Sequence, residues 1–206
     1  MACSGVGLLG EQMRLAVRSR ASRGESGASA VEFALLLPIF VMLTFGTLTG
    51  GIAFWHHIEL TQGARDAARL GATFPISTVP LSEPCEDQRA EKTIDCWLTM
   101  VAEVAATESG WGSLADVNDP DSGAVICVAY VAGPGDTIST KNAIAGEKQS
   151  DNLPSDNSAP CFKDDQPESR VQVFVRRDAE FNAVLFNSDL ELRTRSSIPY
   201  ERRDTT

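Results

Sequence analysis

Residues 23–55 read RGESGASAVEFALLLPIFVMLTFGTLTGGIAFW, and the rest of the chain is organised around this stretch. A basic segment precedes it, small residues occupy 26–30, and an apolar run without charge extends from Phe33 to Trp55. That run is about 23 residues long, enough to cross a roughly 30 Å hydrocarbon core as a helix. Glu32 places a carboxylate at the start of the run, where a charge is costly and requires a partner or a function.

A secretory signal peptide is the first alternative, since it also begins with basic residues and continues with an apolar core. Its apolar region is usually about 7–15 residues long and ends in a small-residue cleavage site. Here the small residues precede the apolar run, and the polar segment 56–60 follows it. The better position for a peptidase is therefore Gly27–Ala28, which leaves the membrane helix on the mature protein.

The order of these residues resembles a type IV prepilin: Gly27, then Glu32 at the fifth mature position, then Phe33 and an apolar run. The sequences GASAVEFALLLP at 27–38 and QGARDAARLGA at 62–72 resemble the TadE-like family, which are pseudopilins of the tight-adherence (Flp, type IVc) pilus system. This resemblance implies cleavage by a prepilin peptidase at Gly27–Ala28. It also implies a minor pilin role in assembly of a pilus for adhesion, biofilm formation or surface attachment. The implied partners are other pilins and inner-membrane pilus assembly proteins.

The charge distribution predicts the orientation of the helix. Four arginines lie close before the apolar run, and basic residues that flank a membrane segment mark its cytoplasmic side. They are Arg14, Arg18, Arg20 and Arg23. We expect a single-pass protein of the cytoplasmic membrane with its amino terminus inside, its outer domain outside, and possible incorporation into an extracellular pilus. The formal net charge of −10 argues against a nucleic-acid partner, because phosphates require a basic surface.

The five cysteines agree with an outer domain. Cys3 lies in the predicted leader, and the other four lie beyond the apolar run, where disulfides persist. Three pairings are possible, and we favour Cys85–Cys96 with Cys127–Cys161. A zinc site is the alternative, but no two cysteines have the close spacing of zinc ligands.

The hydrophobic pattern divides the chain into a leader (1–27), a transmembrane and extended helix (28–75) and an extracytoplasmic α+β domain (76–206). The helix is expected to run from Ala28 to about Thr73. A second helix is predicted within 86–109, strands at 125–132, 170–177 and 190–197, a short helix or strand at 181–186, and a mobile insertion near 133–160. The expected fold is α+β and pilin-like, with a helix packed on a small antiparallel sheet.

No catalytic or metal-binding pattern stands out. The two histidines, His56 and His57, lie at the outer end of the apolar run, and adjacent helical positions point about 100° apart. The sequence contains no P-loop and no G-x-G-x-x-G on a strand–helix turn. We therefore expect a non-enzymatic protein without a cofactor or a metal.

Glu32 is the residue with a predicted mechanism. Cleavage before Ala28 creates an amine four positions away, and positions i and i+4 are neighbours on a helix. Glu32 then meets its own amine or, as the resemblance implies, the amine of an adjacent subunit. The alternatives are a Glu32 that snorkels to the cytoplasmic interface, and an uncleaved single-pass anchor for an extracytoplasmic binding module. The sequence leaves open whether Met1 or Met13 is the true start.

Overall fold

The computed structural model describes residues 25–76, 93–146, 153–183 and 186–201. It contains α1 (Glu25–Thr73), α2 (Thr93–Glu108) and α3 (Leu114–Val117), with strands β1 (Ala124–Val131), β2 (Lys141–Gly146), β3 (Arg170–Ala183) and β4 (Phe186–Pro199). The chain divides into two compact units, residues 1–41 and 42–206. Helix α1 begins in the first unit and continues into the second, which also holds every other element.

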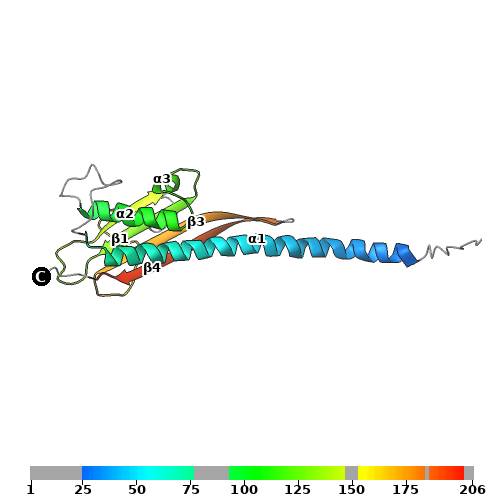
Figure 1. Cartoon of the computed structure of the whole chain (residues 1–206), viewed down its shortest axis with the longest axis horizontal. Coiled ribbons are helices and arrows are strands. Elements are labelled where there is room, and N and C mark those ends of the chain that lie inside the picture. The colour runs from blue at the N-terminus through cyan, green and yellow to red at the C-terminus, as the bar shows by residue number, and fades with distance from the viewer. Residues whose placement is uncertain (1–24, 77–92, 147–152, 184–185, 202–206) are drawn as a thin grey trace, which may run out of the picture. The chain divides into compact units, whose positions relative to one another are not determined.

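The four strands form one antiparallel sheet in the order β2-β1-β3-β4 (Figure 1). Strands β3 and β4 are each 14 residues long and form a hairpin whose pairs run from Arg170 with Pro199 to Ala183 with Phe186. Strand β1 is central, and all eight of its residues are buried. Because β1 is buried on both faces, other parts of the chain must pack on both faces of the sheet, and different elements do so on each face.

The carboxyl-terminal half of α1 covers one face with small side chains. Its buried positions follow helical spacing and are Leu60, Ala64, Ala67, Ala68 and Ala72. Small residues allow close packing, most clearly at Gly63, where an added Cβ would lie 2.2 Å from the Ser109 hydroxyl oxygen at the end of α2. This packing explains the run of alanines and glycines after the apolar segment.

Helix α2 and an aromatic cluster complete that side of the core. Trp97 of α2 meets Tyr130 of β1 edge to face with ring centroids 6.2 Å apart, and Tyr130 meets Tyr200 at 5.3 Å. The Trp97 indole donates to the carbonyl of Phe74 at 3.1 Å, and the Tyr200 hydroxyl accepts from the amide of Ile76 at 3.0 Å. The cluster therefore joins the end of α1 to α2, the sheet and the end of β4.

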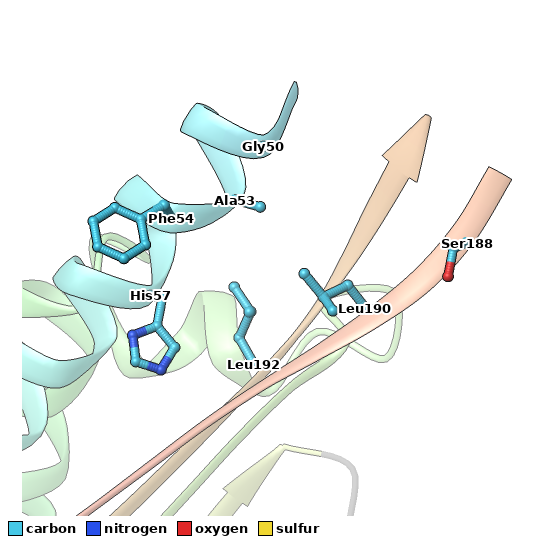
Figure 2. Close-up of a pocket in the computed structure, with 7 residues that line it drawn as sticks. All are labelled: Gly50, Ala53, Phe54, His57, Ser188, Leu190 and Leu192. Atoms are coloured by element: carbon cyan, nitrogen blue, oxygen red, sulfur yellow. The ribbon is translucent and has the colours of Figure 1, made fainter. Parts of the chain in front are cut away.

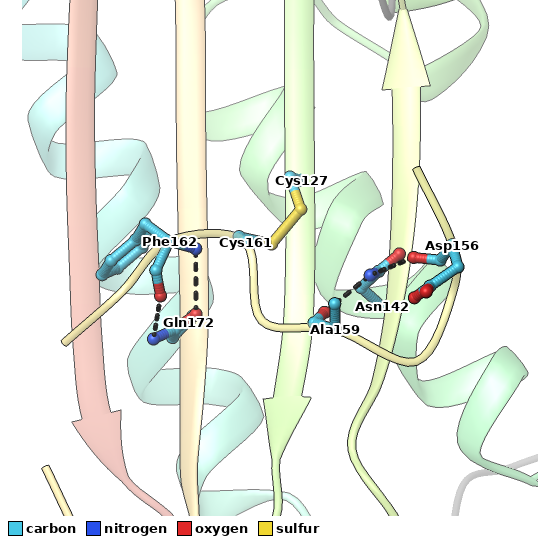
Figure 3. The surroundings of a disulfide bond; sticks show 7 residues. All are labelled: Cys127, Asn142, Asp156, Ala159, Cys161, Phe162 and Gln172. Atoms are coloured by element: carbon cyan, nitrogen blue, oxygen red, sulfur yellow. Dashed lines mark hydrogen bonds between the residues drawn. A yellow bond between two sulfur atoms is a disulfide. The ribbon is translucent and has the colours of Figure 1, made fainter. Parts of the chain in front are cut away.

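The opposite face of the sheet is covered by the segment before β3 rather than by a helix (Figure 3). The disulfide Cys127–Cys161 ties this segment to β1, which confirms that predicted pairing. The Gln172 side chain donates to the carbonyl of Phe162 at 3.0 Å and accepts from its amide at 3.3 Å. The Asn142 side chain donates to two further carbonyls of the segment, at 2.9 and 2.6 Å.

Several predicted elements require correction. The predicted insertion near 133–160 contains strand β2, which the sequence analysis missed because its only large apolar residue is Ile144. Residues 181–183 belong to β3 and Phe186 to β4, so the strand alternative for 181–186 is confirmed at these residues. The last strand begins at Phe186 rather than Leu190. The second helix is confirmed over Thr93–Glu108, and its predicted start at 86–92 lies outside the described residues.

The structure describes only one of the two cysteines of the other predicted disulfide. Cys96 is disulfide-bonded, whereas Cys85, its predicted partner, lies outside the described residues, as does Cys3. The pairing Cys85–Cys96 therefore stays a prediction.

Candidate membrane helix and assembly site

The apolar part of α1 is exposed along most of its length. Phe33, Leu35 and Phe40 are 66%, 70% and 73% exposed. The other large apolar side chains exposed on this helix include Val31, Leu36, Leu37, Ile39, Met42, Leu43, Phe45, Leu48, Ile52, Phe54, Trp55 and Ile58. Among the described residues, one helix, Gly27–Thr73, is long and apolar enough to cross a membrane. An apolar surface of this size requires lipid or protein to cover it.

The predicted processing site lies in the first turns of α1. Gly27 and Ala28 are both exposed, and a Cβ added at Gly27 meets no atom within 4 Å. The fold therefore does not demand glycine at position 27, in contrast to Gly63. Packing against the described part of the chain does not explain the glycine.

Glu32 lies one helical turn after Ala28 and is exposed on the surface of α1. Within the part of the chain that the structure describes, its carboxylate makes no hydrogen bond and no ion pair. Phe33, the other predicted assembly residue, is next to it and exposed. The structure therefore brings the predicted processing and assembly residues together on two consecutive turns, with their side chains available to other molecules.

The apolar surface ends in a polar group at Trp55, His56 and Glu59. The Trp55 indole donates a hydrogen bond to the Glu59 carboxylate, and the His56 Nδ1 lies 3.3 Å from Glu59 Oε2. His57 instead lines a groove with apolar residues of α1 and β4. The two adjacent histidine side chains thus lie in different environments, His56 beside the Glu59 carboxylate and His57 in the apolar groove.

The groove lies between α1 and β4 and has a volume of about 500 Å³ (Figure 2). Its walls are mostly apolar, with Gly50, Ala53, Phe54 and His57 on α1 facing Ser188, Leu190 and Leu192 on β4. The sequence analysis did not predict this groove. The only signal for it is the alternation of Leu190 and Leu192, which shows that one face of β4 is apolar but not what lies opposite.

The fold and the helix together define a class of protein. A long amino-terminal apolar helix, packed through its later turns on a four-stranded antiparallel sheet with a short helix, is the pilin-like α+β arrangement.

The family is more specific than the fold. Residues 27–69 match the model of the family described as TadE-like protein, so this segment is similar to that family. The matched residues begin at Gly27 and end within the small-residue face of α1, before α2 and the sheet. No curated protein and no solved structure matches the chain.

Proposed function

We propose that this chain is a minor pseudopilin that takes part in assembly of a tight-adherence pilus. The observation that carries the proposal is the TadE-like match, which begins at Gly27 and includes Glu32 and the exposed apolar helix. The resulting pilus serves adhesion, biofilm formation or surface attachment. The role is structural, and its partners are other pilins and inner-membrane pilus assembly proteins.

The first step is removal of the leader by a prepilin peptidase. Hydrolysis of the Gly27–Ala28 peptide bond releases residues 1–27 and gives the mature chain a new amino group on Ala28. Two observations support this site: a Cβ added at Gly27 meets none of the described residues within 4 Å, and Gly27 is the first residue of the family match.

The mature chain remains in the cytoplasmic membrane through α1, with its amino terminus inside and the α+β domain outside. The support for this orientation is the group of arginines before the apolar run, since basic flanks stay on the cytoplasmic side. Disulfide Cys127–Cys161 is consistent with an oxidising location for the domain.

The assembly step uses the carboxylate of Glu32. A carboxylate in lipid is costly, and an ammonium group on a neighbouring subunit reduces that cost. The support is that Glu32 is exposed and has no partner among the described residues, while Ala28 lies one turn away. Pairing between Glu32 of one subunit and Ala28 of another would set the register between them.

The amino-terminal residue of the protein tests the proposal. Protein purified from membranes of a host with an active prepilin peptidase should begin at Ala28, as measured by amino-terminal sequencing or intact mass. A Gly27→Leu variant should retain its leader, and a Gly46→Leu variant of the same helix should be processed normally.

Recovery of the native chain with Met1 or Met13 at its start would contradict the proposal and support an uncleaved anchor. Co-purification of the processed chain with a major pilin is the second expected result.

A further inference from the structure

Part of the β3–β4 hairpin extends beyond the rest of the sheet (Figure 1). The last residue of β3 that pairs with β1 is Arg177. Among the described residues, 178–183 and 186–191 of the hairpin therefore pair only with each other in the sheet. We call these residues the arm. The groove described above places Ser188 and Leu190 of the arm beside Gly50, Ala53 and Phe54 of α1 (Figure 2). The arm therefore lies alongside helical residues that the sequence analysis assigned to the membrane.

The two faces of the arm differ in polarity. Leu190 faces α1, and the alternation of side chains along a strand sends Asp189 and Glu191 to the other face. Asp178, which is paired with Glu191 in register, lines a polar pocket together with Asp189 and Glu191. The Asp178 side chain is 53% exposed and that of Glu191 is 36% exposed. The outward face of the arm thus carries three carboxylates in contact with solvent. Glu191 is paired with Arg193, and Arg176 lies near Asp178 and Glu191.

This arm is unsuited to the hydrocarbon core for two independent reasons. Strand β4 is an edge of the sheet, and no other described strand pairs with its outward side. Exposed sheet edges do not occur in lipid, because unpaired backbone groups find no water there. Carboxylates facing lipid add a second large cost.

We propose that the arm stays outside the hydrocarbon and thereby limits how deeply α1 enters the membrane. The inference rests on the proposed function, since it assumes that α1 is inserted. The lipid-embedded segment then ends before Gly50 and consists of residues 28–49 instead of 33–55. At 1.5 Å per residue this segment is about 33 Å long, which still crosses a core of roughly 30 Å.

The shifted span changes the surroundings of two residues. Glu32 moves about 6 Å inside the inner boundary, because it is four residues after Ala28. Trp55 and its hydrogen bond to Glu59 move out of the core toward the headgroups, a layer that suits an indole with a polar partner. The apolar groove then lies at the outer membrane surface, beside the headgroups.

Single cysteines in the full chain test this inference, with a membrane-impermeant maleimide added to intact spheroplasts. Suitable positions are the exposed residues Leu43, Ile52, Ile58 and Asp189. The disulfide-bonded cysteines do not react with maleimide, and oxidised Cys127–Cys161 reports that each variant is folded. We expect Ile52→Cys and Asp189→Cys to be labelled as readily as Ile58→Cys, and labelling to be lost at Leu43→Cys.

The other outcomes separate the inference from the proposed function. Protection of both Ile52→Cys and Asp189→Cys would overturn the depth limit and leave membrane insertion intact. Labelling of Asp189→Cys with protection of Ile52→Cys would also overturn it, because the arm would then have lifted away from α1. Labelling of Leu43→Cys would show that α1 is not inserted and would contradict the proposed function itself.

Discussion

At the scale of single residues, two positions on α1 carry opposite kinds of constraint. Gly63 is required by its own chain, since a side chain there would enter the end of α2. Glu32 is exposed and makes no hydrogen bond or ion pair with the described residues, so its proposed role lies in contact with another molecule.

Replacing Glu32 by leucine tests the assembly role. Glu32→Leu should still insert and still be cleaved, because a more apolar helix enters lipid at lower cost. It should be incorporated poorly, since the carboxylate that attracts a neighbouring amine is gone. The measurement is the ratio of this subunit to the major pilin in purified assemblies. Glu32→Asp, which keeps the charge, is the control, and normal incorporation of Glu32→Leu would contradict the pairing.

Replacing Gly63 by alanine tests the helix contact. Alanine favours a helix by about 1 kcal/mol over glycine, but overpacking a tight contact costs typically 1–3 kcal/mol. Because an added Cβ at Gly63 would also lie 2.8 Å from the Ser109 amide nitrogen, we expect net destabilisation by about 1–2 kcal/mol. Urea unfolding in detergent, followed by tryptophan fluorescence, measures this.

Gly46→Ala is the matched control for that measurement, since an added Cβ there meets nothing within 4 Å. It should be neutral or slightly stabilising. Equal stability of the two variants would show that α1 and α2 are not in close contact at Gly63.

At the scale of elements, the segment before β3 packs on the face of the sheet opposite α1 and α2. Its contacts to the sheet are the disulfide Cys127–Cys161, the paired hydrogen bonds of Gln172 and the two hydrogen bonds from Asn142. It is also joined to β3 by an ion pair between Asp164 and the largely buried Arg170. These covalent and polar contacts hold the segment in place, and its Leu153 and Phe162 pack on the apolar residues of this face.

The ion pair makes part of this stability dependent on pH. Burial raises the pKa of Asp164, but hydrogen bonds from Arg170, Ser197 and Gln172 outweigh burial and hold the pKa below the ordinary aspartate range. A carboxylate with a lowered pKa stabilises the fold above its unfolded pKa, and this contribution disappears as the pH falls through its folded value. The loss is therefore expected below about pH 4.

The variant Asp164→Asn checks this expectation. At pH 6 it should be less stable than the native chain, and the difference in unfolding free energy should shrink on acidification to pH 3. Asp165→Asn, at the exposed neighbouring position, is the control. A difference that persists unchanged at pH 3 would show that the charge of Asp164 is not what stabilises the segment.

At the scale of the whole molecule, α1 combines two surfaces in one element. Residues 31–58 expose large apolar side chains, whereas residues 60–72 bury small ones against α2 and the sheet. The exposed side chains of 31–58 need lipid or another protein to cover them, whereas the side chains of 60–72 are buried by this chain itself. The chain thus combines a packed domain with an exposed apolar surface that requires lipid or protein to cover it.

A charge placed in the exposed apolar surface of residues 31–58 should weaken membrane association without disturbing the folded domain. An arginine at the centre of a membrane helix costs about 2.5–3.5 kcal/mol on insertion scales. Leu43→Arg should therefore lower the fraction of protein that stays with membranes after an alkaline wash, while Cys127–Cys161 still forms. Ile58→Arg, beyond the apolar run, is the control. Equal retention of both variants would show that α1 does not cross the membrane.

Local patterns in the sequence predicted α1, the whole described length of α2 and three of the four strands. They also predicted the Cys127–Cys161 disulfide, and they singled out Gly27, Ala28, Glu32 and Phe33. Uncharged length, helical spacing and strand alternation are properties of neighbouring residues, so one chain is enough to read them. Strand β2 was missed because its stability comes from pairing with the buried β1, and that contact leaves little trace in its own residues.

What the sequence alone determined is therefore the apolar helix, the small-residue face that follows it and the family that this stretch resembles. Only the tertiary structure decided that the β3–β4 hairpin extends past β1 and lies beside Gly50–Phe54. The reason is physical. The polarity of each strand face can be read locally, but which helical turns it meets depends on strand register and on the packing of residues more than a hundred positions apart.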